Sequence, residues 1–276
     1  MFTAIIERKT IEGKFMADWQ RILVKVGTST IVDSTGQVNY PVINRLAQVL
    51  TTLEKDGHEI LFVTSGAIGV AIDQMGLDSR PKEIPQQQAL AAIGQGYLMT
   101  IYNQAFSFYQ QLIGQVLLTY DVFENPAMLA NTKAAINELL MQKVIPIVNE
   151  NDVIAVDELD HQHSFGDNDR LAALLAEEMG ADLIVLSDVD ALYTANPNTN
   201  PQAKPLRKIH EVTDAIRQAA TGSTSGLGTG GMATKLKAAE YMMAHGREMA
   251  LINGNNPENI RAVIEGKAIG THFQGE

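Results

Sequence analysis

The sequence contains no cysteine among its 276 residues. Disulfide bonds, thiolate metal sites and cysteine nucleophiles are therefore excluded. Basic residues are also scarce, because 21 Lys and Arg stand against 32 Asp and Glu, for a formal charge of -11 with neutral histidines. Nonspecific nucleic-acid binding needs clustered Lys and Arg, so we expect no nucleic-acid partner. An anionic substrate can still bind where local donors outweigh the global charge.

Long hydrophobic runs are missing as well. No apolar run approaches the ~18 residues of a membrane span, so no membrane association is expected. Residues 1–20 scatter Glu, Arg and Lys through their few apolar positions and lack the continuous apolar core of a signal peptide. We therefore predict a cytoplasmic protein in which residues 1–20 form an extension and residues 21–276 form a single domain.

Three common nucleotide or hydrolase signatures are either absent or found in the wrong context. Val63 occupies the place of the first glycine in Gly-x-Ser-x-Gly, so Ser65 is not the nucleophile of a triad hydrolase. Residues 226–231 match Gly-x-Gly-x-x-Gly, but a polar run precedes them where a dinucleotide-binding motif needs a strand. No Gly-Lys-Ser/Thr sequence supplies a P-loop. Rossmann-type dinucleotide binding and Walker-type phosphate binding are thus both disfavoured.

Short apolar runs alternate with helical patterns along the chain, which predicts an α/β protein with a mainly parallel sheet. The runs predict strands at residues 21–27, 59–63, 112–118, 144–148, 182–186, 249–252 and 268–273. The 3.6-residue patterns predict helices at 42–55, 86–110 (one or two helices, interrupted around Gly94 and Gly96), 127–143, from 171, 214–220, 232–245 and 257–264, and the glycine turn at 64–69 is expected to open a further helix.

A polar stretch from Val148 to Arg170 joins one predicted strand to the next predicted helix. The carboxyl ends of strands form the edge of an α/β sheet where ligands bind. A bland alternative is an acidic surface loop followed by a helix cap, and for His161 and His163 within it we expect a surface loop rather than a metal site. The number of polar residues nevertheless favours a small polar ligand. They are Asn149, Glu150, Asn151, Asp152, Asp167, Asn168 and Asp169.

Two lysines stand beside glycine turns. Lys25 lies inside an apolar run that ends at Gly27, and it is either a lysine of an edge strand that reaches solvent or a cation held at a strand end. Lys235 lies in the first turn of a helix that follows a glycine-rich loop, which is either a mobile turn or an anion site made of N–H groups, helix N-terminus and lysine. Two lysines and an acidic, amide-rich cluster are the equipment of phosphoryl transfer.

Taken in order, the motifs of this chain resemble the amino acid kinase family, and within it the members that phosphorylate glutamate. The resemblance runs from about residue 21 to residue 273 and implies a three-layer αβα sandwich with a mainly parallel eight-stranded sheet. The motifs are Lys25–Ser29, Thr64–Ile68, Gln87–Gln95, Asn149–Asp152, Phe165–Asp169 and Gly228–Lys235.

The resemblance implies an activity and a set of residue roles. The activity is phosphorylation of the γ-carboxylate of L-glutamate by ATP with Mg²⁺, giving L-glutamyl 5-phosphate in the first step of proline biosynthesis. The implied catalytic residues are Lys25, Lys235 and Asp169, with no metal ligand among the side chains. The implied glutamate-binding residues are Ser65, Asp152 and Asn168, with Asn149 and Asp167 beside them. The implied ATP-binding residues are Lys25, Ser187, Asp188, Thr229, Gly230, Gly231, Met232, Ala233, Thr234 and Lys235.

Partners and rival functions follow from the same resemblance. It implies a homo-oligomer, feedback inhibition by proline and functional coupling to glutamyl phosphate reductase, and we expect the short form that lacks a C-terminal PUA domain. The sequence departs from the family pattern at Ser187, Ala191 and Asn196, all in the nucleotide half. Rivals are kinases of the same family that act on acetylglutamate, carbamate, aspartate or UMP, and a non-catalytic amino-acid sensor. The sensor should have lost a lysine or the glycine loop, and this chain keeps both.

Overall fold

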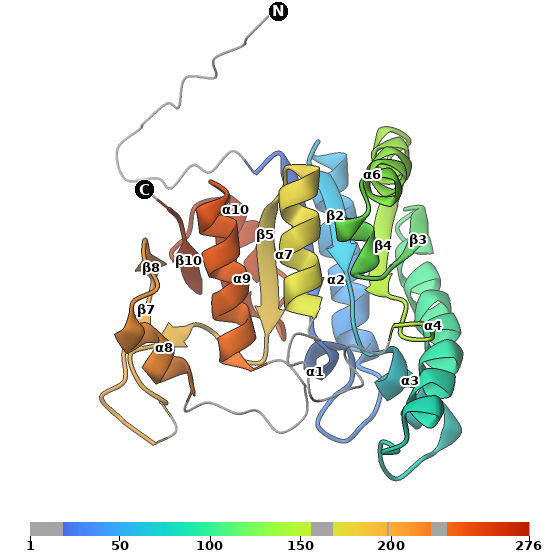
Figure 1. Ribbon diagram of the computed structural model, residues 1–276, viewed down its shortest axis with the longest axis horizontal. Coiled ribbons are helices and arrows are strands. Elements are labelled where there is room, and N and C mark those ends of the chain that lie inside the picture. The colour runs from blue at the N-terminus through green and yellow to red at the C-terminus, as the bar shows by residue number, and fades with distance from the viewer. Residues whose placement is uncertain (1–18, 156–167, 198, 222–230, 276) are drawn as a thin grey trace, which may run out of the picture.

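A computed structural model of the chain describes residues 19–155, 168–197, 199–221 and 231–275. Within these residues the strands form one eight-stranded sheet of order β3-β4-β2-β1-β5-β9-β10-β8 and a separate two-stranded β6–β7 pair. Neighbours in the large sheet are parallel except β9 and β10 (Figure 1). The predicted fold class, a mainly parallel eight-stranded sheet between helices, is confirmed.

The element bounds are close to those predicted. The strands are β1 (Arg21–Val26), β2 (Glu59–Val63), β3 (Ile113–Leu118), β4 (Ile145–Glu150), β5 (Asp182–Ser187), β6 (Leu192–Tyr193), β7 (Pro205–Leu206), β8 (Lys208–Ile209), β9 (Met249–Asn253) and β10 (Thr271–Phe273). The helices are α1 (Thr28–Ile31), α2 (Tyr40–Lys55), α3 (Ala67–Met75), α4 (Ile84–Ser107), α5 (Asp121–Glu124), α6 (Pro126–Met141), α7 (Asn168–Met179), α8 (Asp214–Thr221), α9 (Met232–Ala244) and α10 (Asn259–Ile264).

Alternation of side chains along the strands sends apolar groups to both faces of the sheet, which builds three layers. Ile22, Val24 and Val26 of β1 belong to the core cluster that contains residues of α2, α4 and α10. Leu23 belongs to the opposite cluster, with residues of α6, α7 and α9 (Figure 1). Because strand residues alternate with period two, Lys25 shares the face of Leu23 and is directed toward α7 and α9.

The strand order places β1 at the point where the chain reverses its direction of travel across the sheet. β1 pairs with β2 on one side and with β5 on the other, both in parallel. The crevice beyond the carboxyl ends of such strands is the usual ligand site of an open α/β sheet. The edge-strand alternative for Lys25 is therefore wrong, because β1 is an interior strand and Lys25 is 2% exposed.

Several local predictions need correction. The residues after the expected glycine turn at Gly27 lie in the short helix α1, which Gly27 precedes as the N-cap. The strands β6, β7 and β8 and the helix α5 are too short to leave a periodic pattern and were not predicted.

The search for a membrane-spanning helix, made over the described residues, found none of sufficient length and hydropathy.

The predicted interruption of the helix at residues 86–110 is also wrong, because α4 is continuous from Ile84 to Ser107. Gly94 is needed for packing and not for a break. A Cβ built on Gly94 would lie 1.8 Å from the carbonyl oxygen of Ala67, at the start of α3. The close approach of α3 to α4 therefore requires a residue without a side chain at this position.

Substitution of Gly94 by alanine is expected to lower the free energy of unfolding by about 1–3 kcal/mol, because the added methyl must push α3 and α4 apart. Gly96 provides a matched control in the same helix, since a Cβ there meets nothing within 4 Å. Gly96→Ala should instead raise the stability by roughly 0.5–1 kcal/mol through helix propensity. Urea unfolding of both variants would measure the difference, and equal effects would contradict the packing role of Gly94.

Candidate active site

Lys25 and Lys235 converge on one carboxylate, that of Asp169. The Lys25 Nζ atom lies 2.5 Å from Asp169 Oδ1, and the Lys235 Nζ atom lies 3.1 Å from Asp169 Oδ2. Each comes from a different element around the crevice, namely the end of β1, the first turn of α7 and the first turn of α9. All three residues are nearly removed from solvent. Lys25 is 2% exposed, Lys235 is 8% exposed and Asp169 is 0% exposed.

This trio has a positive balance, because two ammonium groups share one carboxylate (2 − 1 = +1). Buried charges are costly unless they are paired, and Asp169 pairs with both lysines. Thr234 fixes the carboxylate further by donating its hydroxyl to Asp169 Oδ2 at 3.0 Å. The arrangement is thus a rigid, buried cluster of two cations and one anion within a chain of formal charge -11.

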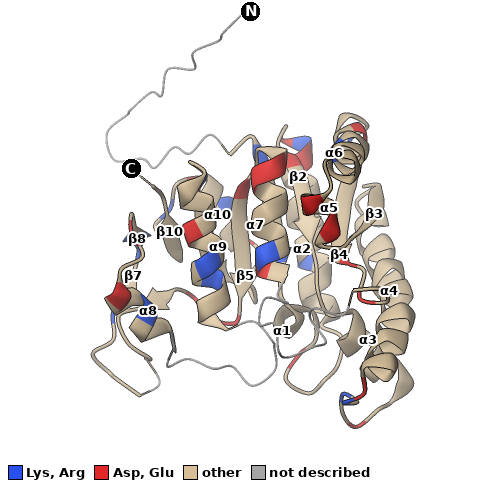
Figure 2. Ribbon diagram, in the orientation of Figure 1, with Lys and Arg blue, Asp and Glu red and all other residues tan. Residues whose placement is uncertain are grey.

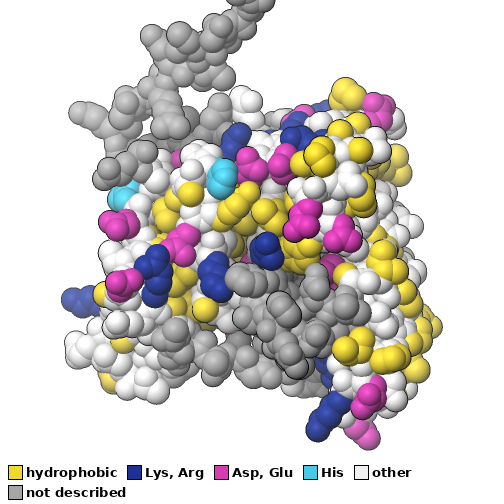
Figure 3. Space-filling model, in the orientation of Figure 1, with side chains coloured by type: hydrophobic (Ala, Val, Ile, Leu, Met, Phe, Trp, Pro, Cys, Tyr) yellow, Lys and Arg dark blue, Asp and Glu magenta, His cyan; other side chains and the backbone are white. Residues whose placement is uncertain are grey.

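Charged side chains of both signs lie on the described surface near α7 and α9. Figure 2 shows charged residues at the first turn of α7 and along α9. Figure 3 shows acidic and basic side chains interspersed over the face that these helices cover, among the residues that are coloured. The coloured surface in this view (Figure 3) therefore carries no large patch of a single charge.

A second cluster, made of amides and a hydroxyl, begins one residue before Asp169. Asn168 donates its Nδ2 hydrogens toward Ser65 Oγ at 2.6 Å and Thr64 O at 3.1 Å. The same nitrogen lies 3.3 Å from Asn149 Oδ1, at the end of β4. Gly66, at φ +94°, provides the left-handed turn that directs the chain from β2 into α3 beside this cluster. The first turn of α7 therefore serves two adjoining clusters.

Asp152 lies just after β4, in the turn that follows Asn151. Burial raises the pKa of its carboxyl group to about 6, and the positive charge of Arg80 opposes this rise. Arg80 is itself held in place, since its Nε and Nη2 atoms donate to Gln87 Oε1 at 2.9 and 2.6 Å. The Oδ1 atom of Asp152 is buried and has no hydrogen-bond partner in the described part of the chain. Asp152 is thus a carboxylate suited to a cationic ligand group.

The raised pKa of Asp152 predicts opposite effects of pH on binding and on stability. The folded protein retains this proton to higher pH than the unfolded chain, so its contribution to stability declines as pH rises from about 4 to about 6. Substitution by asparagine should therefore stabilise the fold at pH 8 by up to about 3 kcal/mol. The affinity for an ammonium-bearing ligand should fall in the wild type as pH drops through 6, because the carboxylate loses its charge.

Thermal unfolding and ligand titration of wild type and Asp152→Asn at pH 5 and pH 8 would measure both effects. A destabilised variant at pH 8, or a ligand affinity that does not change between the two pH values, would contradict this view of Asp152.

The predicted nucleotide residues occupy the other side of the crevice. Ser187 ends β5 and donates its hydroxyl to Asp188 Oδ1 at 3.0 Å. The Gly254 N–H donates to Ser187 O at 2.7 Å, which joins the ends of β5 and β9. Gly231 caps α9, and Met232, Ala233 and Thr234 form its first turn with Lys235.

Three predicted site residues lie outside the described residues, namely Asp167, Thr229 and Gly230, as do His161 and His163. Among the residues that are described, no group of three or more His, Asp and Glu side chains could hold a metal ion.

Two residues near the clusters received no role in the sequence analysis. Gln95 of α4 accepts a hydrogen bond from Asn149 Nδ2 at 2.9 Å, and Arg80 acts on Asp152. Gln95 is the last residue of the family-like motif Gln87–Gln95, and this motif was the sequence signal that could have predicted a role for it. Arg80 carries no motif, and its place depends on how the loop before α4 folds.

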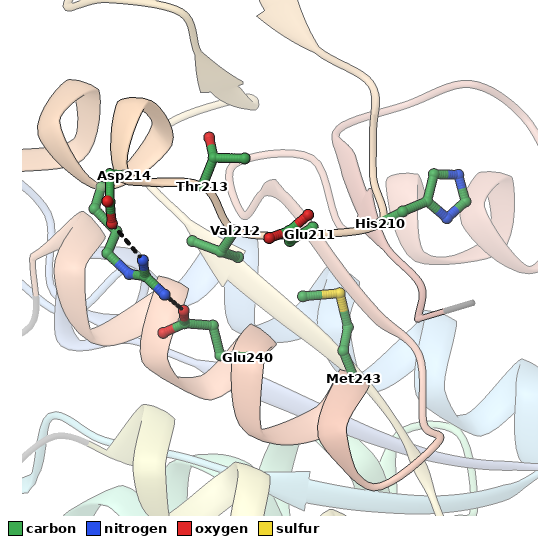
Figure 4. A pocket seen from close by; sticks show the side chains of 8 residues that line it. His210, Glu211, Val212, Thr213, Asp214, Glu240 and Met243 are labelled. Atoms are coloured by element: carbon green, nitrogen blue, oxygen red, sulfur yellow. Dashed lines mark hydrogen bonds and ion pairs between the residues drawn. The ribbon is translucent and has the colours of Figure 1, made fainter.

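A separate hollow of about 490 Å³ lies away from both clusters, between the residues after β8, the start of α8 and the second half of α9. Figure 4 shows dashed lines that end on two of its acids, Asp214 and Glu240. Arg217 donates to Asp214 at 2.9 Å and forms a short ion pair with Glu240. One arginine stands here among three acids, Glu211, Asp214 and Glu240, so the formal charge of the hollow is negative and does not suit an anionic ligand.

The fold and the paired lysines define a class of protein. The chain belongs to the amino acid kinase family, whose family model matches residues 20–253. More specifically, its curated relatives are named glutamate 5-kinase. The protein from Oenococcus oeni is 55% identical over 264 residues, which is 95% of this chain and 98% of that protein. Those from Lactococcus lactis subsp. lactis and Ligilactobacillus salivarius are both 49% identical, over 92% and 95% of this chain and 94% and 99% of their own lengths.

Solved structures support the same fold at low sequence identity. A carbamate kinase from Giardia lamblia, bound to AMP-PNP, has a TM-score of 0.65 at 15% identity and covers 93% of this chain and 99% of its own. A UMP kinase from Bacillus anthracis has a TM-score of 0.63 at 17% identity, covering 93% and 96%. An isopentenyl phosphate kinase from T. acidophilum has a TM-score of 0.60 at 19% identity, covering 91% and 99%.

Proposed function

We propose that this protein transfers the γ-phosphoryl group of ATP to the γ-carboxylate of L-glutamate, which gives L-glutamyl 5-phosphate and ADP and opens proline biosynthesis. The convergence of Lys25 and Lys235 on the buried carboxylate of Asp169 carries the proposal. The relatives named glutamate 5-kinase support the choice of acceptor, since they match nearly the whole chain.

The reaction asks for alignment and charge stabilisation rather than for a general base. A γ-carboxylate is ionised at neutral pH, so its oxygen can attack the γ-phosphorus while the bond to the β–γ bridging oxygen breaks and ADP departs. Lys25 and Lys235 would neutralise charge on the phosphoryl oxygens and the leaving group. Each ammonium at ~4 Å is worth on the order of 4 kcal/mol at an effective dielectric constant near 20, before desolvation is subtracted.

The remaining residues would position the two substrates. Asp169 holds both lysines, while Ser65, Asn168, Asn149 and Asp152 hold the amino acid, joined by Asp167. Thr229–Lys235 would cover the phosphates with N–H groups at the start of α9, and Ser187 and Asp188 would contact the nucleotide. Mg²⁺ would be held by the phosphates and would neutralise their charge.

The proposal divides the domain of residues 21–276 into a glutamate-binding N-terminal half and an ATP-binding C-terminal half. It also extends to location and partners. The enzyme would act in the cytoplasm as a homo-oligomer. Proline shares the α-carboxylate with glutamate and carries its ammonium in a ring, and it would compete at the glutamate site. Because an acyl phosphate is labile, glutamyl phosphate reductase would consume the product promptly.

The deciding experiment measures ADP release from ATP and Mg²⁺ with glutamate, aspartate, N-acetylglutamate or UMP as acceptor, with and without hydroxylamine. Turnover that needs glutamate and yields a hydroxamate is the expected result, because hydroxylamine traps an acyl phosphate. Turnover with another acceptor alone would move the substrate within the family. Glutamate binding without any turnover would favour an amino-acid sensor.

A further inference from the structure

A chain of side-chain amides crosses the candidate glutamate site from α4 to α7. Asn149 Nδ2 donates to Gln95 Oε1 at 2.9 Å. Asn149 Oδ1 accepts from the Glu150 N–H at 2.9 Å and lies 3.3 Å from Asn168 Nδ2. Gln95, on α4, is the end of this chain that has no role so far.

Backbone groups at two points determine which way each amide faces. The Glu150 N–H can only donate, so Asn149 must present its oxygen there and its nitrogen to Gln95. Gln95 therefore turns its oxygen toward Asn149 and its Nε2 group away. The carbonyl of Thr64 can only accept, so Asn168 presents its nitrogen there and its Oδ1 faces elsewhere.

The network thus leaves specific polar atoms without partners. Gln95 Nε2, Asn168 Oδ1 and Asp152 Oδ1 are buried and make no hydrogen bond within the described part of the chain. The first is a donor and the other two are acceptors. Buried polar groups in folded proteins are nearly always satisfied, so such a set indicates a ligand of complementary chemistry. The amino-acid end of glutamate fits, since its carboxylate accepts hydrogen bonds and its ammonium donates them.

A second contact holds α4 against this part of the site. Gln88 donates its Nε2 hydrogen to Val153 O at 2.9 Å, just beyond Asp152. Gln88 and Gln95 are seven residues apart, which places them on the same face of the helix, two turns from each other. Their hydrogen bonds attach the segment from Asn149 to Val153 to α4 at two points. Gln95 is therefore held by a rigid element beside Asn149, at the start of the segment that carries Asp152.

We propose that Gln95 is a specificity-determining residue that donates its Nε2 hydrogen to the α-carboxylate of the amino-acid acceptor, while Asp152 and Asn168 accept from the α-ammonium. The inference rests on the proposed function and adds to it the residue that recognises the α-carboxylate. The γ-carboxylate then extends toward Lys25 and Lys235.

Three acceptor compounds that differ in their α-groups can show which of these groups Gln95 contacts. L-Glutamate carries both α-groups, 4-aminobutyrate lacks the α-carboxylate, and glutarate lacks the ammonium. The variant Gln95→Met keeps the side-chain length and removes both polar atoms. The variant Gln95→Glu keeps an oxygen for Asn149 but replaces the donor by a negatively charged acceptor. Each acceptor is scored by kcat/KM or, where turnover is slow, by its inhibition constant against L-glutamate.

Gln95→Met should lose about 10- to 100-fold with glutamate and with glutarate, the range for a hydrogen bond to a charged group. Gln95→Glu should lose at least as much with both, because its charge also repels the α-carboxylate. With 4-aminobutyrate Gln95→Met should stay within about 3-fold of wild type, because the lost contact has no counterpart in that compound. Gln88→Met is the matched control on the same helix face, and it should affect all three acceptors alike.

Two outcomes would overturn the inference. Equal losses with all three acceptors would show that Gln95 only supports Asn149, and a loss that spares glutarate would place Gln95 at the ammonium. A wild-type enzyme that does not phosphorylate glutamate would instead refute the proposed function. Melting temperatures of the variants near that of wild type would confirm that folding is not the cause.

Discussion

Replacing Lys235 by alanine is expected to lower kcat with glutamate by about 100- to 1,000-fold, as loss of a transition-state donor does at an oxyanion site. The Lys235 ammonium is buried and lies 3.1 Å from Asp169, so no water can take its place without reorganisation. The glutamate dissociation constant should change little, because the amide cluster around Asn168 does not contain this lysine. Steady-state kinetics combined with calorimetric glutamate titration would test both halves.

Lys237 is the matched control for this prediction. It lies two residues further along α9 and is exposed. Lys237→Ala should leave kcat within about 2-fold of wild type, since an exposed charge is screened by solvent. If Lys235→Ala weakened glutamate binding as much as turnover, the separation between the phosphoryl-binding lysines and the amino-acid-binding amides would be refuted.

Replacing Asp169 by asparagine is expected to affect stability and catalysis together. The substitution removes the negative charge that both lysines contact, at a position with no exposed surface. Breaking a buried ionic cluster by removing one partner costs roughly 3–5 kcal/mol. The two ammonium groups would also repel each other and lose their alignment, so we expect kcat to fall by at least about 100-fold.

Asp214→Asn provides the comparison for a surface ion pair. Asp214 pairs with Arg217 at 2.9 Å, but its side chain is 91% exposed. Such pairs contribute about 0–1 kcal/mol, so chemical denaturation should barely separate this variant from wild type. An Asp169→Asn protein as stable as Asp214→Asn and as active as wild type would show that Asp169 does not organise the lysines.

Local patterning was sufficient to predict most of the fold. The interior strands are continuous β-branched and aliphatic runs, as expected where both faces of a sheet are covered, and the bounds of β1, β2 and β5 agree with those runs to within one residue. The order of the strands was not accessible in this way. For that reason Lys25 could be an edge residue by sequence and is an interior one by structure.

The candidate site was predictable in composition but not in its contacts. A lysine beside a glycine turn signals an anion, and this much could be read locally. That Lys25 and Lys235 meet on Asp169 depends on the packing of α7 against β1 and of α9 against α7, which joins residues far apart in the chain. Gly94 illustrates the same limit, because its helix propensity predicted a break while the contact with Ala67 explains its presence.

The first turn of α7 has one more consequence. Asn168 and Asp169 are adjacent, and in a helix adjacent side chains diverge by about 100°. Under the proposed roles, Asn168 binds the amino-acid end of the acceptor, and Asp169 positions the two lysines at the other end of the acceptor. The helix then fixes the distance between the amide cluster and the lysines, and this distance selects the length of the acceptor. Aspartate, one methylene shorter, would be held by the same amides and would present its carboxylate short of the phosphoryl group. Selection for glutamate would then be set by the rigid backbone of α7, and changing a single contact residue would not shift the preferred length.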